Sequence, residues 1–160
     1  MIKRPKIIVF DLDCTLWPFH VDTHFTPPFR KKEDQVVDAY GQGVRHFKDV
    51  PEILKKLKDE GYELGVASRT SEIQGAQQLL DLFDWRKYFK YIEIYPGTKT
   101  THFSKIKRQS NADYEEMMFF DDEYRNIRDC NEIGVTSIYV RDGVSLSLIE
   151  KSLENFKKQS

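Results

Sequence analysis

The chain has 160 residues, of which 39% are hydrophobic and 32% charged, a composition typical of one soluble domain with a buried core. Its formal net charge of −1 gives no overall field that would favour nucleic acid or a membrane surface, so we expect neither as a partner. No apolar run reaches transmembrane length and no signal peptide is evident, which predicts a cytoplasmic protein, a nuclear location being also compatible. Its two cysteines favour free thiols over a disulfide framework.

A continuous apolar run at residues 7–10 predicts a buried central strand, and two carboxylates, Asp11 and Asp13, follow it directly. Carboxylates at the end of a buried strand cost free energy unless something binds them. Side chains alternate along a strand, so Asp11 and Asp13 would share a face and together attract a cation. Hard oxygen ligands suit Mg²⁺, although such a pair also occurs in plain turns.

The stretch from 17 to 47 contains three prolines and two glycines and has no helical period. It predicts a flap or β-hairpin inserted after the first strand, because long loops in compact domains are usually functional. Within it, His20 and His24 are spaced like a zinc-binding pair but lack the glutamate of the HExxH motif. We therefore interpret both histidines as flap residues.

The rest of the chain alternates between helical and strand patterns. This alternation predicts an α/β fold, a doubly wound, Rossmann-like, mainly parallel sheet with helices on both faces, in a single domain over residues 1–160. Helices are predicted over 50–60, 71–83, 99–109, 123–133 and 145–156, and strands over 64–67, 91–95, 117–120 and 135–140.

In such sheets, ligands bind at the carboxyl ends of the strands. Polar residues follow three of the predicted strands, and a lysine begins a helix a few residues after another. We therefore expect one edge of the sheet to gather Asp11, Asp13, Ser68, Arg69, Lys99, Asp121 and Asp122.

These residue types together permit phosphoryl transfer. Asp11 can attack phosphorus and form an aspartyl-phosphate. Asp13 can protonate the leaving oxygen and then deprotonate the water that clears the intermediate. The Ser68 hydroxyl and the Lys99 ammonium can hold phosphoryl oxygens and offset the charge that develops on them.

The acidic pair after the fourth predicted core strand would complete the metal shell, with Asp122 as a ligand and Asp121 contributing directly or through water. Each motif alone has a simpler interpretation: the pair could cap the next helix, Ser68 could lie in a turn, and Lys99 could be a solvated helix residue. Their joint order along the chain favours the common site.

In this order the motifs resemble the haloacid dehalogenase superfamily in its phosphatase branch, and within it the eukaryotic magnesium-dependent phosphatase-1 family. Members of that family carry Tyr at the position of Cys14, so this residue departs from the family's pattern. The resemblance covers nearly the whole chain and is weakest over 26–48. It is carried by residues 10–19 (FDLDCTLWPF), 22–24, 67–75 (ASRTSEIQG), 93–97 (EIYPG), 101–103 and 119–126 (FFDDEYRN).

The resemblance implies Asp11 as the nucleophile and Asp13 as the acid/base, with Mg²⁺ as the cofactor. It further implies an enzyme without a large cap domain that acts on phosphoproteins, including phosphotyrosine, or on sugar phosphates. By the same resemblance the metal ligands are Asp11, the backbone carbonyl of Asp13, and Asp122, and the substrate contacts are Leu12, Asp13, Ser68, Arg69 and Lys99.

The main alternative is a phospho-accepting signalling module like a receiver domain, which shares the doubly wound sheet and the acidic cluster. In a receiver domain the phosphorylated aspartate ends a middle strand along the chain and has no partner like Asp13. An inactive relative kept for protein binding is disfavoured because no catalytic position is missing. A phosphomutase usually needs an enclosing cap to exclude water, and no insertion of that length is present.

Overall fold

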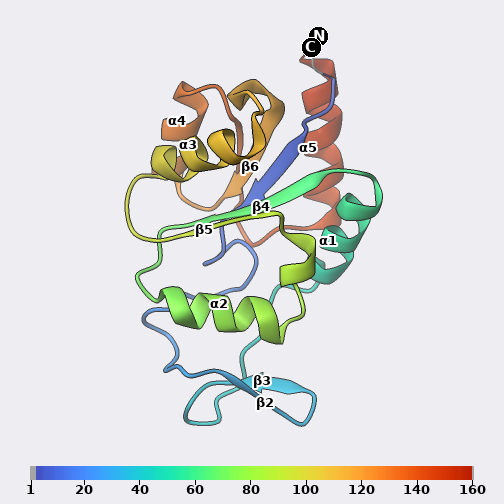
Figure 1. Cartoon of the computed structure of the whole chain (residues 1–160). Helices are drawn as coiled ribbons and strands as arrows, with labels where there is room; N and C mark the ends of the chain where they lie inside the picture. Colours follow the sequence, from blue (N-terminus) through green and yellow to red (C-terminus); the bar gives the residue numbers. More distant parts are fainter. Residues whose placement is uncertain (1–2, 160) are drawn as a thin grey trace.

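A computed structural model describes residues 3–159 of the chain, and its centre is a five-stranded parallel sheet in the order β5-β4-β1-β6-β7 (Figure 1). β1 occupies the middle, where Ile7 pairs with Glu63 on one side and Met117 on the other. The apolar run therefore forms the central strand, as predicted. The strands are β1 (Ile7–Phe10), β4 (Glu63–Ser68), β5 (Tyr91–Ile94), β6 (Met117–Asp121) and β7 (Thr136–Tyr139).

Helices cover both faces of the sheet, which confirms the predicted doubly wound fold. Ile8 and Phe10 of β1 pack in one core cluster, with residues of α1, α2 and α5, whereas Ile7 and Val9 pack in another, with residues of α3 and α4. This division follows from the alternation of side chains along a strand. The helices are α1 (Val50–Asp59), α2 (Ile73–Leu82), α3 (Lys99–Ser110), α4 (Tyr124–Glu132) and α5 (Leu146–Lys158), with short 3₁₀ turns at Arg86–Tyr88 and Tyr114–Glu116.

The helix ends differ from the predicted ends by one or two residues, for reasons visible in the caps. α2 begins at Ile73, because Glu72 is its N-cap and accepts a hydrogen bond from the Gly75 amide. Ser145 caps α5 as predicted and accepts a hydrogen bond from the Leu148 amide at 3.1 Å. None of the helices within residues 3–159 combines the length and the apolar character needed to cross a bilayer.

The flap over residues 17–47 contains the predicted hairpin, made of β2 (Arg30–Lys32) and β3 (Gln35–Val37), and no domain-sized cap. The buried Trp17 ring anchors its start, stacking on Trp85 with centroids 6.1 Å apart. Further along, the buried Asp38 carboxylate accepts hydrogen bonds from three flap amides, those of Thr26, Tyr40 and Gln42. The flap is thus an ordered loop that packs beside α2 (Figure 1).

Candidate active site

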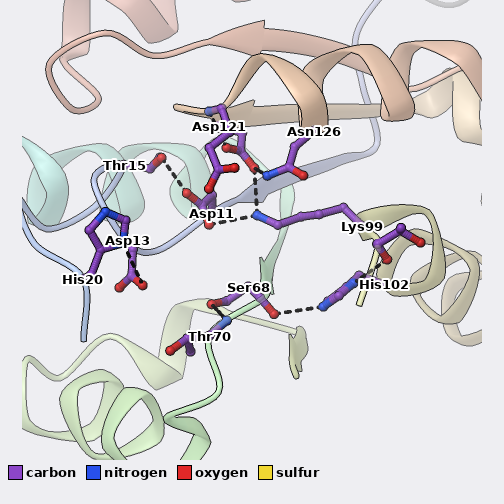
Figure 2. Close-up of polar contacts among 12 residues, drawn as sticks. Asp11, Asp13, Thr15, His20, Ser68, Thr70, Lys99, His102, Asp121 and Asn126 are labelled. Atoms are coloured by element: carbon purple, nitrogen blue, oxygen red, sulfur yellow. Dashed lines mark hydrogen bonds and ion pairs between the residues drawn. The ribbon is translucent and has the colours of Figure 1, made fainter. Parts of the chain in front are cut away.

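The predicted polar residues meet at the carboxyl edge of the sheet, around Asp11, and Figure 2 labels five of them: Asp11, Asp13, Ser68, Lys99 and Asp121. Asp11 follows β1, and its amide donates to the Phe120 carbonyl at 3.0 Å, which extends the pairing with β6. Its Oδ2 accepts a hydrogen bond from Thr15 Oγ1 at 3.0 Å, and its Oδ1 accepts one from Lys99 Nζ at 2.8 Å. The carboxylate is therefore held in one orientation at the floor of the site.

Lys99 reaches this carboxylate from the first turn of α3 and is 1% exposed. Its Nζ atom also donates to Asp121 Oδ2 at 2.7 Å, so the ammonium bridges two carboxylates. Burial opposes the charged form, but the carboxylates of Asp11 and Asp121 outweigh it and raise the Lys99 pKa above its ordinary value. Lys99 is thus a fixed positive charge beside the proposed nucleophile.

The acidic pair lies at the end of β6, with Asp121 as the last residue of that strand. Asp121 Oδ1 accepts from the Glu123 amide at 2.8 Å, and its Oδ2 accepts from Asn126 Nδ2 at 3.0 Å. Burial and the neighbouring Asp11 carboxylate raise the pKa of Asp121 to about 6 and that of Asp122 to about 8. A cation bound beside these carboxyls would lower both pKa values, because it favours the ionised form.

Carboxylate oxygens of Asp11, Asp121 and Asp122 all lie within 4.8 Å of one another, as the ligands of one metal ion would. When all three are ionised, the group with Lys99 carries a formal charge of −2, which a divalent cation would neutralise. An all-oxygen donor set suits Mg²⁺ or Ca²⁺. The residues present therefore fit a hard divalent cation.

Asp13 faces the same cavity but in a different environment. Its Oδ1 accepts hydrogen bonds from Trp17 Nε1 at 2.8 Å and from the Val21 amide at 3.1 Å. Its Oδ2 lies 3.8 Å from His20 Nδ1. Burial raises the pKa of Asp13 to about 6, although these two hydrogen bonds oppose the rise. A carboxyl with this pKa can both give and take a proton near neutral pH.

Ser68 ends β4 on the opposite wall, where its Oγ accepts a weak hydrogen bond from the Thr70 amide at 3.3 Å. Arg69 lines the cavity beside it. Among residues 3–159, Arg69 Nε is a buried side-chain atom without a hydrogen-bond partner. Such a donor is costly unless a ligand satisfies it, which suits an anionic group in the cavity.

A cavity of about 280 Å³ connects these side chains. Its walls bring together five of the predicted site residues with flap residues and the Pro96-Gly97 turn. Three predicted site residues do not line it: Asp121 and Asp122, which lie behind Asp11 and Lys99 in the carboxylate cluster, and Leu12, whose side chain is buried in the core so that only its backbone can meet a substrate. The lining residues are Asp11, Asp13, His20, Asp22, Ser68, Arg69, Thr70, Pro96, Gly97, Lys99, Glu123 and Asn126.

His102 is a site residue that the sequence analysis missed. The ring is completely buried on α3, with Nε2 lying 2.8 Å from the carbonyl oxygens of both Ser68 and Tyr95, and Nδ1 3.1 Å from that of Thr98. Burial lowers its pKa, although the three carbonyls oppose the shift. In the neutral ring a proton on Nε2 can be donated to the carbonyls of both Ser68 and Tyr95, and Nδ1 then has no proton to donate to Thr98. His102 thereby ties the end of β4 to the start of the helix that carries Lys99. In the sequence, His102 belonged to the 101–103 segment of the family resemblance and lay three residues after Lys99, one turn along the helix, but neither feature gave it a role in the site.

The flap contributes more to the cavity than predicted. His20 and Asp22 line it, and His20 lies beside Asp13, so the histidine is more than a packing residue of the flap. His24 is not a partner of His20 in a shared metal cluster; its Nδ1 accepts a hydrogen bond from the His20 amide at 2.7 Å. Side-chain contacts of this kind leave no periodic pattern in a loop sequence.

The parallel sheet, with acidic residues and a buried lysine at its carboxyl edge, defines the class of haloacid dehalogenase-like hydrolases. A HAD-like hydrolase superfamily protein of Schizosaccharomyces pombe is 40% identical over 147 residues, which cover 84% of this chain and 85% of that protein. The N-terminal part of a Bacteroides fragilis protein, containing a phosphatase domain complexed with Mg, has the same fold, with a TM-score of 0.64 at 20% identity over 88% of this chain and 37% of that one.

Two further comparisons are more specific. The acid phosphatase family model matches residues 3–159. Magnesium-dependent phosphatase 1 of Homo sapiens is 51% identical over 159 residues, which cover 99% of this chain and 90% of the human protein. The chain therefore belongs to the acid phosphatase family, and the resemblance indicated by its motifs is confirmed.

Proposed function

We propose that the chain, as one domain over residues 1–160, is a Mg²⁺-dependent phosphatase that hydrolyses phosphomonoesters through an aspartyl-phosphate on Asp11. The observation that carries this proposal is the pairing of two aspartates in one cavity but in different environments. Asp11 is hydrogen-bonded to Lys99 and Thr15, whereas Asp13 has a pKa raised to about 6 by burial. Two carboxyls with separate proton affinities are what a nucleophile and an acid/base require.

In the first step, an oxygen of Asp11 attacks phosphorus and the bond from phosphorus to the ester oxygen breaks. Asp13 gives its proton to that departing oxygen. In the second step, Asp13 takes a proton from water, whose oxygen attacks the same phosphorus and releases inorganic phosphate from Asp11. Asp13 is held for both transfers by Trp17 and the Val21 amide.

The phosphoryl oxygens would be bound by Lys99, the Ser68 hydroxyl, the Arg69 guanidinium and the backbone that follows Asp11 at Leu12 and Asp13. Lys99 is prepositioned by its bonds to Asp11 and Asp121, so it need not reorganise as charge develops. Arg69 brings a buried donor without a partner among the described residues. Its place at the wall favours substrate binding over chemistry.

Mg²⁺ would be held by Asp11, Asp122 and the backbone carbonyl of Asp13, with Asp121 contributing directly or through water. When bound, the ion would neutralise phosphoryl charge and align the phosphate for attack. The support is the cluster of carboxylates within 4.8 Å, together with the human relative, which is named for its dependence on magnesium. A receiver-like signalling role is disfavoured, since Asp13 would shorten the life of any phosphorylated state.

The substrate class follows from the shape of the entrance. The cavity is bordered by the flap, the Pro96-Gly97 turn, the loop after β4 and the start of α4, and the described residues include no domain-sized cap over it. A phosphate on a folded protein could therefore reach Asp11. We therefore propose phosphoproteins, including phosphotyrosine, as substrates, with sugar phosphates as the small-molecule class that the same cavity admits.

The test is a phosphatase assay on a phosphotyrosine protein and a panel of sugar phosphates, with Mg²⁺ and after exhaustive chelation. Asp11→Asn should lower the rate by several orders of magnitude, and Asp13→Asn should also be severely impaired; Asp34→Asn, an exposed flap acid, is the matched control. Enzyme quenched with acid during turnover should carry a phosphate on Asp11, detected by mass spectrometry and removed by hydroxylamine as an acyl phosphate, and Asp11→Asn should carry none. Full activity without metal, or turnover without any phosphorylated Asp11 in the quenched enzyme, contradicts the mechanism.

A further inference from the structure

A second cluster of metal-ligand side chains lies at the mouth of the cavity, apart from the carboxylates of Asp11, Asp121 and Asp122. It consists of Asp13, His20 and Asp22, whose ligand atoms all lie within 4.8 Å of one another. All three residues line the same cavity, and Figure 2 shows the His20 ring above Asp13. Two of its members come from the flap.

Local hydrogen bonds hold this cluster in place. Trp17 and the Val21 amide both donate to Asp13 Oδ1, which leaves Oδ2 turned toward His20 Nδ1 at 3.8 Å. The His20 carbonyl accepts hydrogen bonds from the amides of residues 23 and 24, which close a turn around Asp22. The flap therefore presents its imidazole and carboxylate to the free oxygen of Asp13.

The other nitrogen of the His20 ring also has a contact. Its Nε2 lies 3.6 Å from Cys14 Sγ, while the ring itself is about half exposed, with 48% of the side chain accessible. With its proton on Nε2, the ring would donate to Cys14 Sγ, and Nδ1, on the side of Asp13, would be available to a metal ion.

The chemistry of the donor set distinguishes this cluster from the carboxylate cluster. Imidazole suits Zn²⁺, Cu²⁺ and Ni²⁺, whereas Mg²⁺ prefers oxygen ligands throughout. Zinc bonds of about 2.0–2.1 Å place neighbouring tetrahedral ligands roughly 3.3 Å apart. The 3.8 Å between Asp13 and His20 needs only a small adjustment, and Asp22 is exposed and free to rotate.

We propose that Asp13, His20 and Asp22 form a binding site for a divalent transition-metal ion such as Zn²⁺. We further propose that an ion bound at this site inhibits the phosphatase. Three protein ligands leave a fourth position for water, as in other open zinc sites. The bound ion would take the Asp13 oxygen that proton transfer requires. The proposal that zinc binds here depends only on the geometry of the three side chains. The proposal that zinc inhibits rests on the proposed function.

Binding is tested directly, without reference to activity. The full chain in saturating Mg²⁺ is titrated with Zn²⁺ against a chromophoric chelator, and with Co²⁺ to record the visible absorption of a four- or five-coordinate site. One Zn²⁺ should bind per chain. His20→Phe and Asp22→Asn should each weaken it about tenfold or more, because even outer-sphere partners of a metal are worth about that much. Asp34→Asn on the flap is the matched control and should bind as the wild type does.

Inhibition is then measured as the ratio of activity with and without Zn²⁺ for each variant in saturating Mg²⁺. The ratio should fall for the wild type and Asp34→Asn and stay near one for His20→Phe. Equal Zn²⁺ affinity in the wild type and His20→Phe overturns the site. If Zn²⁺ inhibits the wild type and His20→Phe equally, or if added Mg²⁺ relieves the inhibition, Zn²⁺ acts at Asp11, Asp121 and Asp122 instead. Either result overturns the proposal that zinc inhibits through His20 and Asp22. If the wild type hydrolyses no phosphomonoester, the proposed function fails, while the titration still decides whether the site binds zinc.

Discussion

Lys99→Met removes the one ammonium buried among the carboxylates of the site. Lys99 is 1% exposed and donates at 2.8 Å to Asp11 and at 2.7 Å to Asp121. Breaking a buried ion pair by deleting one partner costs about 3–5 kcal/mol, because the remaining charge is left uncompensated. For a chain of this length, that corresponds to a fall in Tm on the order of 10 °C.

The pH dependence of this loss has a definite sign. The Lys99 pKa is raised, so the wild-type ammonium stays charged at neutral pH and its contribution would be lost only at strongly alkaline pH. In the variant, the orphaned carboxylates bind protons more readily than in the unfolded chain, and protonation relieves their repulsion. The free energy lost on substitution should therefore be larger at about pH 8 than at about pH 5.

The assay is urea denaturation followed by circular dichroism in metal-free buffer, with Lys151→Met on the exposed face of α5 as the matched control. That control should change the free energy of unfolding by less than about 0.5 kcal/mol. Asp121→Asn in the Lys99→Met background should restore part of the stability, since it removes one of the orphaned charges. A loss below about 1 kcal/mol, or one that grows toward acid pH, would refute the view of Lys99 as the charge that holds the acidic site together.

Three further predictions concern other residues of the site and flap. Arg69→Ala should raise KM about tenfold or more and leave kcat within about threefold, whereas Lys99→Met should lower kcat about 100-fold or more; steady-state kinetics on one substrate separates the two. His102→Ala should lower both stability and kcat, and His102→Gln, which keeps a donor near Nε2, should recover part of kcat; no recovery would make the role of the ring one of packing alone. Burial opposes ionisation of Asp38, but its amide donors lower its pKa below the usual 3.8. Asp38→Asn should therefore cost about 1–2 kcal/mol at about pH 7, and the deficit should shrink as pH falls below about 4, which denaturation at both pH values checks.

Local patterns in the sequence were sufficient to predict the parallel sheet and to predict which polar residues gather at its carboxyl edge. The apolar run at 7–10 predicted a buried strand, and each later strand was marked by the helix and turn around it. Because parallel strands all end at one edge, the order of strands and helices alone predicted that Asp11, Ser68 and Asp121 would lie close together. The boundaries shifted by a residue or two, since cap hydrogen bonds such as that of Glu72 decide them.

The tertiary structure decided what each side chain contacts. No pattern in the sequence indicated that His102 would bridge the carbonyls of Ser68 and Tyr95, or that the flap would set His20 against Asp13. The His102 contacts join different elements, and the His20 contact depends on a loop that has no periodic pattern. Local sequence propensities therefore do not predict either of them. The same holds for the pKa of Asp13, raised to about 6 by burial, because the loss of water around a carboxyl depends on every segment that folds over it.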